Sequence, residues 1–328
     1  MGTNLFFPFI VMNTSFSMSL RRLSVFVILL ATLGCQKRDD AVAEPQTITD
    51  RLLEDSQFGL LRAAVAYAGV SDALKDGNMT LFAPTDAAFQ ASGITAESIR
   101  AMTPAQVRAL VLYHVLYGQV AISAIPSGAN SVEMASKGIA FVNKSTDGAV
   151  SINNAKLTQT TITVANGYIH TIDRVLVPAT GSMLAAIQNN PNLTYLAAAL
   201  KRVSTSSPAL VDMLTSTTAA NGVTVFAPTD AAFMMDKVYN TKTAIESANV
   251  QTLTNTLLYH VIPGAVFSNQ LQSGTYNTLL SGSKLIVTVG AGQITVKGAK
   301  NATLSSVKQA DVLTNNGVIH LIDQVLLP

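Results

Sequence analysis

The eight residues Phe-Ala-Pro-Thr-Asp-Ala-Ala-Phe at 82–89 occur again, unchanged, at 226–233. Two further motifs recur in the same order: Tyr-His at 113–114 and 259–260, and Asn-Gly-x-Ile-His-x-Ile-Asp at 166–173 and 316–323. The copies are 144 residues apart at the first motif (226 against 82) and 150 apart at the last (316 against 166). This nearly constant offset over three motifs predicts the duplication of a complete domain rather than a short solenoid repeat.

Helices are predicted at matching places in the two copies. Apolar residues at helical spacing favour helices over 50–69 and 184–203. Thr-Pro-Ala-Gln at 103–106 has the form of a capping box with proline in the first turn, and predicts a helix from about 104 to 114. Thr-Ala-Ile-Glu at 243–246 gives a similar start in the second copy.

The repeated Pro-Thr-Asp marks the end of a short strand and the start of a helix. A side-chain oxygen just after the proline is expected to accept a backbone N–H of the first helical turn. The candidate capping residues are Thr85 or Asp86 and, in the second copy, Thr229 or Asp230. The later parts of each copy alternate apolar and polar residues between Gly and Asn turns, which predicts antiparallel strands closing with runs at 168–177 and 318–327.

The three motifs together resemble those of the fasciclin domain. The resemblance covers about residues 47–178 and 180–328. It implies an α+β fold of two tandem fasciclin-like domains, each an antiparallel β-wedge flanked by helices. It also implies an extracellular role in cell adhesion or matrix attachment, through protein or polysaccharide contacts.

The composition indicates a weakly charged globular protein. Of 328 residues, 48% are hydrophobic and 12% charged, and the formal net charge is +2. Without residues 1–34, which contain no Asp or Glu, 19 basic residues balance 19 acidic ones. A neutral chain offers no broad basic face, so we expect no nucleic-acid partner.

The N-terminal segment is predicted to be a secretory signal over residues 1–34, with Met18 as an alternative start. Arg21-Arg22 precedes an apolar run too short to span a bilayer as a helix. The single cysteine, Cys35, follows Gly34 and resembles the lipidated cysteine of a bacterial lipobox; an ordinary signal peptide is the alternative. Residues 35–46 then form a tether, and Gln-Lys-Arg-Asp-Asp at 36–40 resembles a sorting signal for the outer face of the outer membrane.

The sequence has few residues and motifs that are typical of catalytic or metal-binding sites. All four histidines occupy equivalent positions in the copies: His114 with His260, and His170 with His320. A zinc site needs three or four ligands close together, whereas each copy has two histidines 56 or 60 residues apart and no cysteine. No nucleophile elbow or phosphate loop is present. We therefore expect neither an enzyme nor a bound cofactor or metal, and interpret His170 and His320 as structural.

The family resemblance suggests two partner-binding elements. One is the Tyr-His pair with branched neighbours, which matches Tyr113-His114 and Tyr259-His260. The other is an Asp-Ile pair, matched nearly by Asp311-Val312; the first copy has Thr161-Ile162 there and no carboxylate. For the Tyr-His pairs a structural role, holding helix against sheet, is the alternative.

Two functional hypotheses follow from these observations. The first is an envelope-anchored adhesion or matrix-binding protein, attached through a lipid on Cys35 and able to self-associate. The second is a glycan or small-ligand carrier associated with an envelope uptake system. The absence of Trp counts against a sugar-stacking surface.

Overall fold

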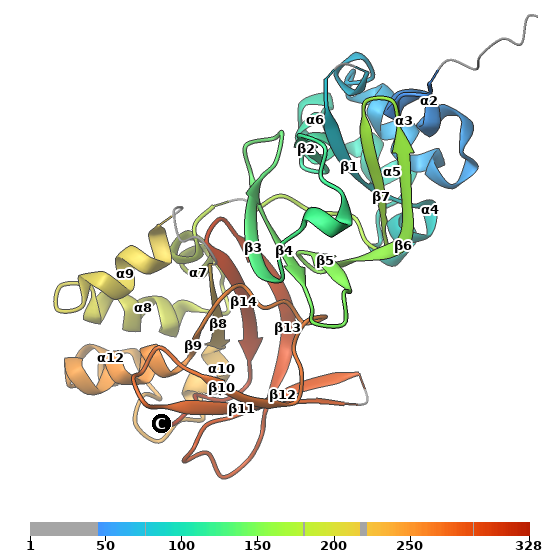
Figure 1. Cartoon of the computed structure of the whole chain (residues 1–328). Helices are drawn as coiled ribbons and strands as arrows, with labels where there is room; N and C mark the ends of the chain where they lie inside the picture. The colour runs from blue at the N-terminus through green and yellow to red at the C-terminus, as the bar shows by residue number, and fades with distance from the viewer. Residues whose placement is uncertain (1–44, 76, 180, 217–221, 291) are drawn as a thin grey trace, which may run out of the picture. The chain divides into compact units, whose positions relative to one another are not determined.

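The computed structural model describes residues 45–75, 77–179, 181–216, 222–290 and 292–328. The predictions for the signal peptide, for Cys35 and for most of the tether lie outside these residues. In the described part, the two sequence copies fold into two units with the same order of strands, and Figure 1 shows both.

The first unit holds a seven-stranded sheet in the order β2-β1-β7-β6-β5-β4-β3. Its strands are β1 (Met79–Pro84), β2 (Val115–Tyr117), β3 (Gly128–Glu133), β4 (Ile139–Lys144), β5 (Val150–Ile152), β6 (Ala155–Val164) and β7 (Gly167–Ile172). Its helices are α2 (Ile48–Glu54), α3 (Gly59–Tyr67), α4 (Asp86–Ala91), α5 (Ala96–Ala101) and α6 (Pro104–Leu112), with 3-10 turns η1 (Ser56–Phe58), η2 (Asp72–Leu74) and η3 (Ile122–Ala124).

The second unit repeats this plan, with the sheet order β9-β8-β14-β13-β12-β11-β10. Its strands are β8 (Val223–Pro228), β9 (Val261–Pro263), β10 (Gly274–Asn277), β11 (Lys284–Gly290), β12 (Gln293–Lys297), β13 (Ser305–Thr314) and β14 (Gly317–Ile322). Its helices are α7 (Met183–Asn189), α8 (Thr194–Val203), α9 (Pro208–Thr215), α10 (Asp230–Met234), α11 (Lys242–Glu246) and α12 (Val250–Tyr259). Figure 1 shows α8, α9 and α12, in yellow and orange, beside β8 and β9.

Each sheet is antiparallel except for one central pair, which the sequence did not indicate. β1 lies parallel to β7, and β8 lies parallel to β14. The first of these pairs opens with Met79 opposite Gly167. A Cβ on Gly167 would come within 1.8 Å of the Met79 carbonyl oxygen, so only glycine permits this close approach.

The repeated motif strand has one apolar core on each side, because successive side chains of a strand point to opposite faces. Leu81 belongs to the core under the helices of the first unit, whereas Phe82 belongs to the core formed with the outer strands. Val225 and Phe226 divide in the same way in the second unit. The buried residues of each of these four clusters come from one sequence copy alone.

The first long helix predicted in each copy is in fact two helices. In the first unit the helix ends at Glu54, and the Asp55 side chain accepts the N–H of Gln57 at the start of a 3-10 turn. In the second unit α7 ends at Asn189, just before Pro191, whose ring cannot continue a helix. Helical periodicity survives these breaks because both segments pack on the same core.

One capping prediction is confirmed and its counterpart is wrong. Thr103 and Gln106 form the expected capping box at the start of α6, in which each side chain accepts the other's backbone N–H. In the second unit Thr243 lies inside α11, which is capped by Thr241. The counterpart of α6 is α12, and Asn249 caps it.

Candidate functional site

The tyrosines of the two Tyr-His pairs are fully buried. The Tyr113 hydroxyl donates to the carbonyl of Ile139 (2.7 Å) and accepts a hydrogen bond from the Asn153 side chain (3.0 Å). The Tyr259 hydroxyl donates in the same way to the carbonyl of Lys284 (2.6 Å). Burial raises the pKa of Tyr113 to about 12, so its hydroxyl remains a neutral bridge between helix and sheet.

The histidines of the pairs connect the same helix to the chain beyond the last strand. His114 Nδ1–H donates to the carbonyl of Leu110 (2.9 Å), and its Nε2 accepts the N–H of Leu176 (2.9 Å). His260 repeats both contacts, to the carbonyl four residues before it (2.7 Å) and from the N–H of Leu326 (2.8 Å). Each ring therefore uses one nitrogen as donor and the other as acceptor, which only the neutral imidazole can do.

Burial lowers the pKa of both His114 and His260 to about 4, from an ordinary value of 6.5. Their hydrogen bonds to backbone carbonyls work against this shift and do not overcome it. Both rings are therefore neutral at pH 7. The surroundings of the two histidines match closely, which agrees with their equivalent positions in the copies.

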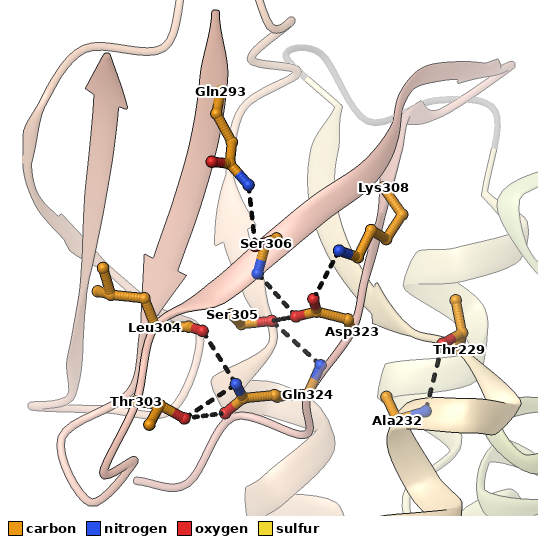
Figure 2. Close-up of polar contacts among 10 residues, drawn as sticks. All are labelled: Thr229, Ala232, Gln293, Thr303, Leu304, Ser305, Ser306, Lys308, Asp323 and Gln324. Atoms are coloured by element: carbon orange, nitrogen blue, oxygen red, sulfur yellow. Dashed lines mark hydrogen bonds and ion pairs between the residues drawn. The ribbon is translucent and has the colours of Figure 1, made fainter. Parts of the chain in front are cut away.

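The threonines of the Pro-Thr-Asp motif are the caps of the short helices that follow. The Thr85 hydroxyl accepts the N–H of Ala88 (3.2 Å) at the start of α4. The Thr229 hydroxyl accepts the N–H of Ala232 (3.3 Å) at the start of α10, as Figure 2 shows.

The aspartates of that motif hold a different helix. Asp86 Oδ1 accepts the N–H of Leu60 (2.8 Å) in the first turn of α3. Asp230 accepts both the N–H of Tyr195 (2.9 Å) and the hydroxyl of Thr194 (2.7 Å) in the first turn of α8. The carboxylate thus bonds orphan donors at the positive end of a helix far away in the sequence. The Thr-Asp pair therefore links two helices, α4 with α3 in the first unit and α10 with α8 in the second.

The histidines of the closing motif are also bonded at both ring nitrogens. His170 Nε2–H donates to the carbonyl of Val120 (2.8 Å), and its Nδ1 accepts the Thr161 hydroxyl (3.1 Å). His320 donates to the carbonyl of Val266 (2.9 Å). Burial lowers the pKa of both histidines. These contacts leave no ring nitrogen available to act as a base.

Asp311 directs its carboxylate toward its own domain. One oxygen accepts the N–H of Ser268 (2.7 Å), and the other accepts the Ser268 hydroxyl. The Asp311 N–H donates to His320 Nδ1 (3.3 Å), and its φ of 62° lies in the left-handed region. Val312 is half-buried and packs against the core beneath the helices. Both residues therefore have contacts within their own domain. Their role as a partner-binding pair stays a prediction.

Replacement of Asp311 separates the structural role from the binding role. Asp311→Ala is expected to lower the free energy of unfolding by about 1 kcal/mol or more, because two half-buried donors of Ser268 lose their acceptor. Asp311→Gly should recover about 1 kcal/mol of that loss, since glycine adopts a positive φ without strain. Urea unfolding of the three proteins measures both effects. Unchanged stability together with lost partner binding would instead identify Asp311 as a contact residue.

The aspartate of the closing motif does not meet the histidine three residues before it, as strand geometry predicts. Asp323 accepts the N–H of Ser306 (2.7 Å) and an ion-paired hydrogen bond from Lys308 (2.9 Å), which Figure 2 shows. Burial raises the pKa of Asp323, but the bonds from Lys308 and Ser306 outweigh it and hold the pKa below its usual value. Asp173 accepts the N–H of Lys156 in the same way (2.7 Å).

The asparagine of the closing motif has a structural role that the sequence analysis missed. Asn166 Oδ1 accepts the N–H of Ile48 (2.9 Å), and its amide donates to the carbonyl of Leu74 (2.9 Å). Asn316 repeats the first contact, with Met183 (2.9 Å). Its recurrence before glycine in both copies was the available signal, but a turn explained that pair equally well.

Within the described ranges, no three His, Cys, Asp or Glu side chains lie close enough to ligate a metal ion. In the same part of the chain, none of the helices has both the length and the apolar character that crossing a bilayer requires.

The family model for the fasciclin domain matches residues 56–178 and 191–328. The chain belongs to the fasciclin-domain family. Each of the two matches contains one of the two seven-stranded sheets, and α2 and α7 precede the matched residues.

Relatives of these fasciclin domains occur in animals and bacteria. Human periostin is 30% identical over 195 residues, which are 57% of this chain and 21% of periostin. Protein sll1483 of Synechocystis is 33% identical over 172 residues, 51% of this chain and 87% of that protein. Immunogenic protein MPB70 of Mycobacterium bovis is 36% identical over 148 residues, 44% of this chain and 67% of that protein.

A similar solved structure is the FAS1 domain pair of the insect cell adhesion molecule fasciclin I. It has 20% sequence identity and a TM-score of 0.39, and the match covers 82% of this chain and 97% of that one.

Proposed function

We propose that this fasciclin-domain protein is held at the cell envelope by a lipid on Cys35, at the outer membrane, and binds an extracellular protein or polysaccharide. Its domains are taken as residues 47–178 and 180–328, joined to the lipid by the tether at 35–46. Adhesion or matrix attachment is the biological role that this binding would serve.

One observation supports binding rather than catalysis. All four histidines lie in the described residues, and both ring nitrogens of each are engaged in hydrogen bonds within the fold. The motif carboxylates likewise bond backbone N–H groups. The four histidines and the four motif aspartates therefore serve to build two copies of one scaffold. We therefore assign the activity of the protein to binding by its outer surface.

The chemistry of that surface favours contacts that are apolar and hydrogen-bonded. Only 12% of the residues are charged, so long-range ionic attraction contributes little to association. Fasciclin domains occur in cell-adhesion and extracellular matrix proteins, which supports a macromolecular partner.

An array of matrix proteins, polysaccharides and small glycans, incubated with residues 47–328, tests this proposal. Binding to a matrix protein or a polysaccharide is the expected result. A chain unfolded in urea and applied in the same way would control for adhesion of exposed apolar segments. Binding confined to small glycans would favour the carrier hypothesis, and binding to nothing on the array would contradict the proposal.

The lipid anchor has its own test. Cys35→Ser is expected to move the protein from the membrane fraction to the soluble fraction, because serine cannot form the thioether that carries the lipid. Detergent-free fractionation with an immunoblot measures the change. Gly34→Ser is the control, because it alters the residue before Cys35 but keeps the thiol, and so reports the effect of altered signal processing alone. Membrane association that persists in Cys35→Ser would refute the anchor.

A further inference from the structure

The second domain has an open hollow of about 520 Å³ at the end of α10. Its lining includes two strongly exposed apolar side chains, Met235 (70% exposed) and Val238 (61% exposed). Lys300, Thr303 and Gln324 also line it. A hollow with exposed long apolar side chains in its wall is a feature of contact surfaces.

The walls of the hollow are held in place by hydrogen bonds. On one wall the Gln324 side-chain amide donates to the Thr303 hydroxyl (3.0 Å) and to the carbonyl of Leu304 (2.9 Å), as Figure 2 shows. At another part of the lining, Asp236 Oδ1 accepts the N–H groups of Val238 and Tyr239 (both 2.8 Å). The surface is thus formed before any partner arrives, which lowers the entropic cost of binding.

The first domain shows that the fold does not require methionine here. α4 and α10 begin with the same motif, but residues 90–91 are Gln-Ala where residues 234–235 are Met-Met. The helix forms in both cases, so the exposed thioether of Met235 is not needed for packing. Methionine is flexible and polarizable and adapts to apolar partner side chains, which gives it a use at a contact surface.

The charge around the hollow is positive. Lys237 and Lys300 line it and are exposed, and they outnumber the one carboxylate of the lining, Asp236, one oxygen of which accepts two backbone N–H groups. A partner that brings a carboxylate beside an apolar group would complement both features.

We propose that this hollow is a docking site for a segment of a partner protein that carries a long aliphatic side chain next to an acidic residue. The proposal rests on the binding role argued above and assigns that role to one face of the second domain. The aliphatic side chain contacts Met235 and Val238, and the carboxylate lies near Lys237 and Lys300.

Selection of random 12-residue peptides, displayed on phage, against the full chain tests this assignment. The enriched peptides are expected to combine Leu, Ile or Met with Asp or Glu. Met235→Ala, which introduces the residue of the first domain, should weaken them at least tenfold, and Lys237→Glu with Lys300→Glu should do the same. Met234→Gln is the matched control: Met234 is 58% exposed, does not line the hollow and becomes the first-domain residue. It should change affinity less than twofold.

Several outcomes would overturn the docking site: peptides that bind Met235→Ala as well as the parent chain, enrichment of basic peptides, or no enrichment. A melting temperature within about 2 °C of the parent shows that a variant is folded. If the Met235→Ala variant still binds a matrix protein on the array, the proposed function holds and this docking site is wrong.

If the selected peptides depend on Met235 but the full chain binds nothing on the array, the docking site holds and the proposed function is wrong.

Discussion

Acidification from pH 7 to pH 4 is expected to unfold both domains, because each of the four buried histidines accepts a hydrogen bond at one ring nitrogen, which only the neutral ring can do. For His114 and His260 the pKa falls from 6.5 to about 4 on folding. Between these values the unfolded chain binds more protons than the folded one, so stability decreases as the pH falls. Their contribution is complete above pH 6.5 and is lost toward pH 4, by about 3 kcal/mol for each ring.

His170 and His320 shift in the same direction, since burial lowers the pKa of each. A domain is stable by only about 5–15 kcal/mol, so the loss from two histidines is a large fraction of the total. Circular dichroism during urea unfolding at steps from pH 7.5 to pH 4 measures the slope.

Glutamine variants provide the control for the acid effect. His114→Gln and His260→Gln keep one donor and one acceptor but cannot titrate. Each variant is expected to be less stable at pH 7 and to lose less stability on acidification than the parent. A parent chain equally stable at pH 7 and pH 4.5 would show that these rings are not buried as neutral groups.

Gly317→Ala is expected to destabilise the second domain by at least about 4 kcal/mol, or to prevent its folding. Gly317 lies opposite Val223 at the start of the parallel pair of β14 and β8. An added Cβ would lie 1.9 Å from the Val223 carbonyl oxygen, and φ at this position is 149°. Because the clash is with backbone, the two central strands would have to separate.

Gly264→Ala separates the clash from the backbone strain. Gly264 has a φ of 85°, but its Cβ would meet no atom within 4 Å. We expect a loss of only about 1 kcal/mol there, from the left-handed conformation alone. Thermal unfolding of both variants measures the difference. Equal effects of the two substitutions would mean that β8 and β14 are not as close as the structure has them.

The motifs predicted the family and the presence of two tandem domains, because the fold requires particular residue types at the motif positions. The glycine of the closing motif permits a backbone contact, and Thr85 and Thr229 cap helices by local hydrogen bonds. Local chemistry of this kind is visible in a sequence. The helix break at Asp55 and the cap at Asn249 were missed, because weak local preferences there compete with one another.

The candidate partner-binding residues show more clearly what could not be predicted from the sequence. The sequence leaves both a binding and a structural role open for Tyr113 and His114, whereas the structure shows that both rings are buried and bonded to backbone carbonyls. Asp311 could not be placed from the sequence, because its acceptor role depends on Ser268, 43 residues earlier.

The sequence by itself determined that one domain was copied, because three motifs recur in the same order. It also located the cap of α6 at Thr103, since the hydrogen-bond partner of that side chain lies only three residues along the chain. Only the tertiary structure decided which long-range partner each polar side chain has, as for Asp86 on α3 and Asp230 on α8. It also decided that Met235 lies exposed beside a hollow. Burial and long-range pairing depend on how distant segments pack, and no local pattern of residues records that.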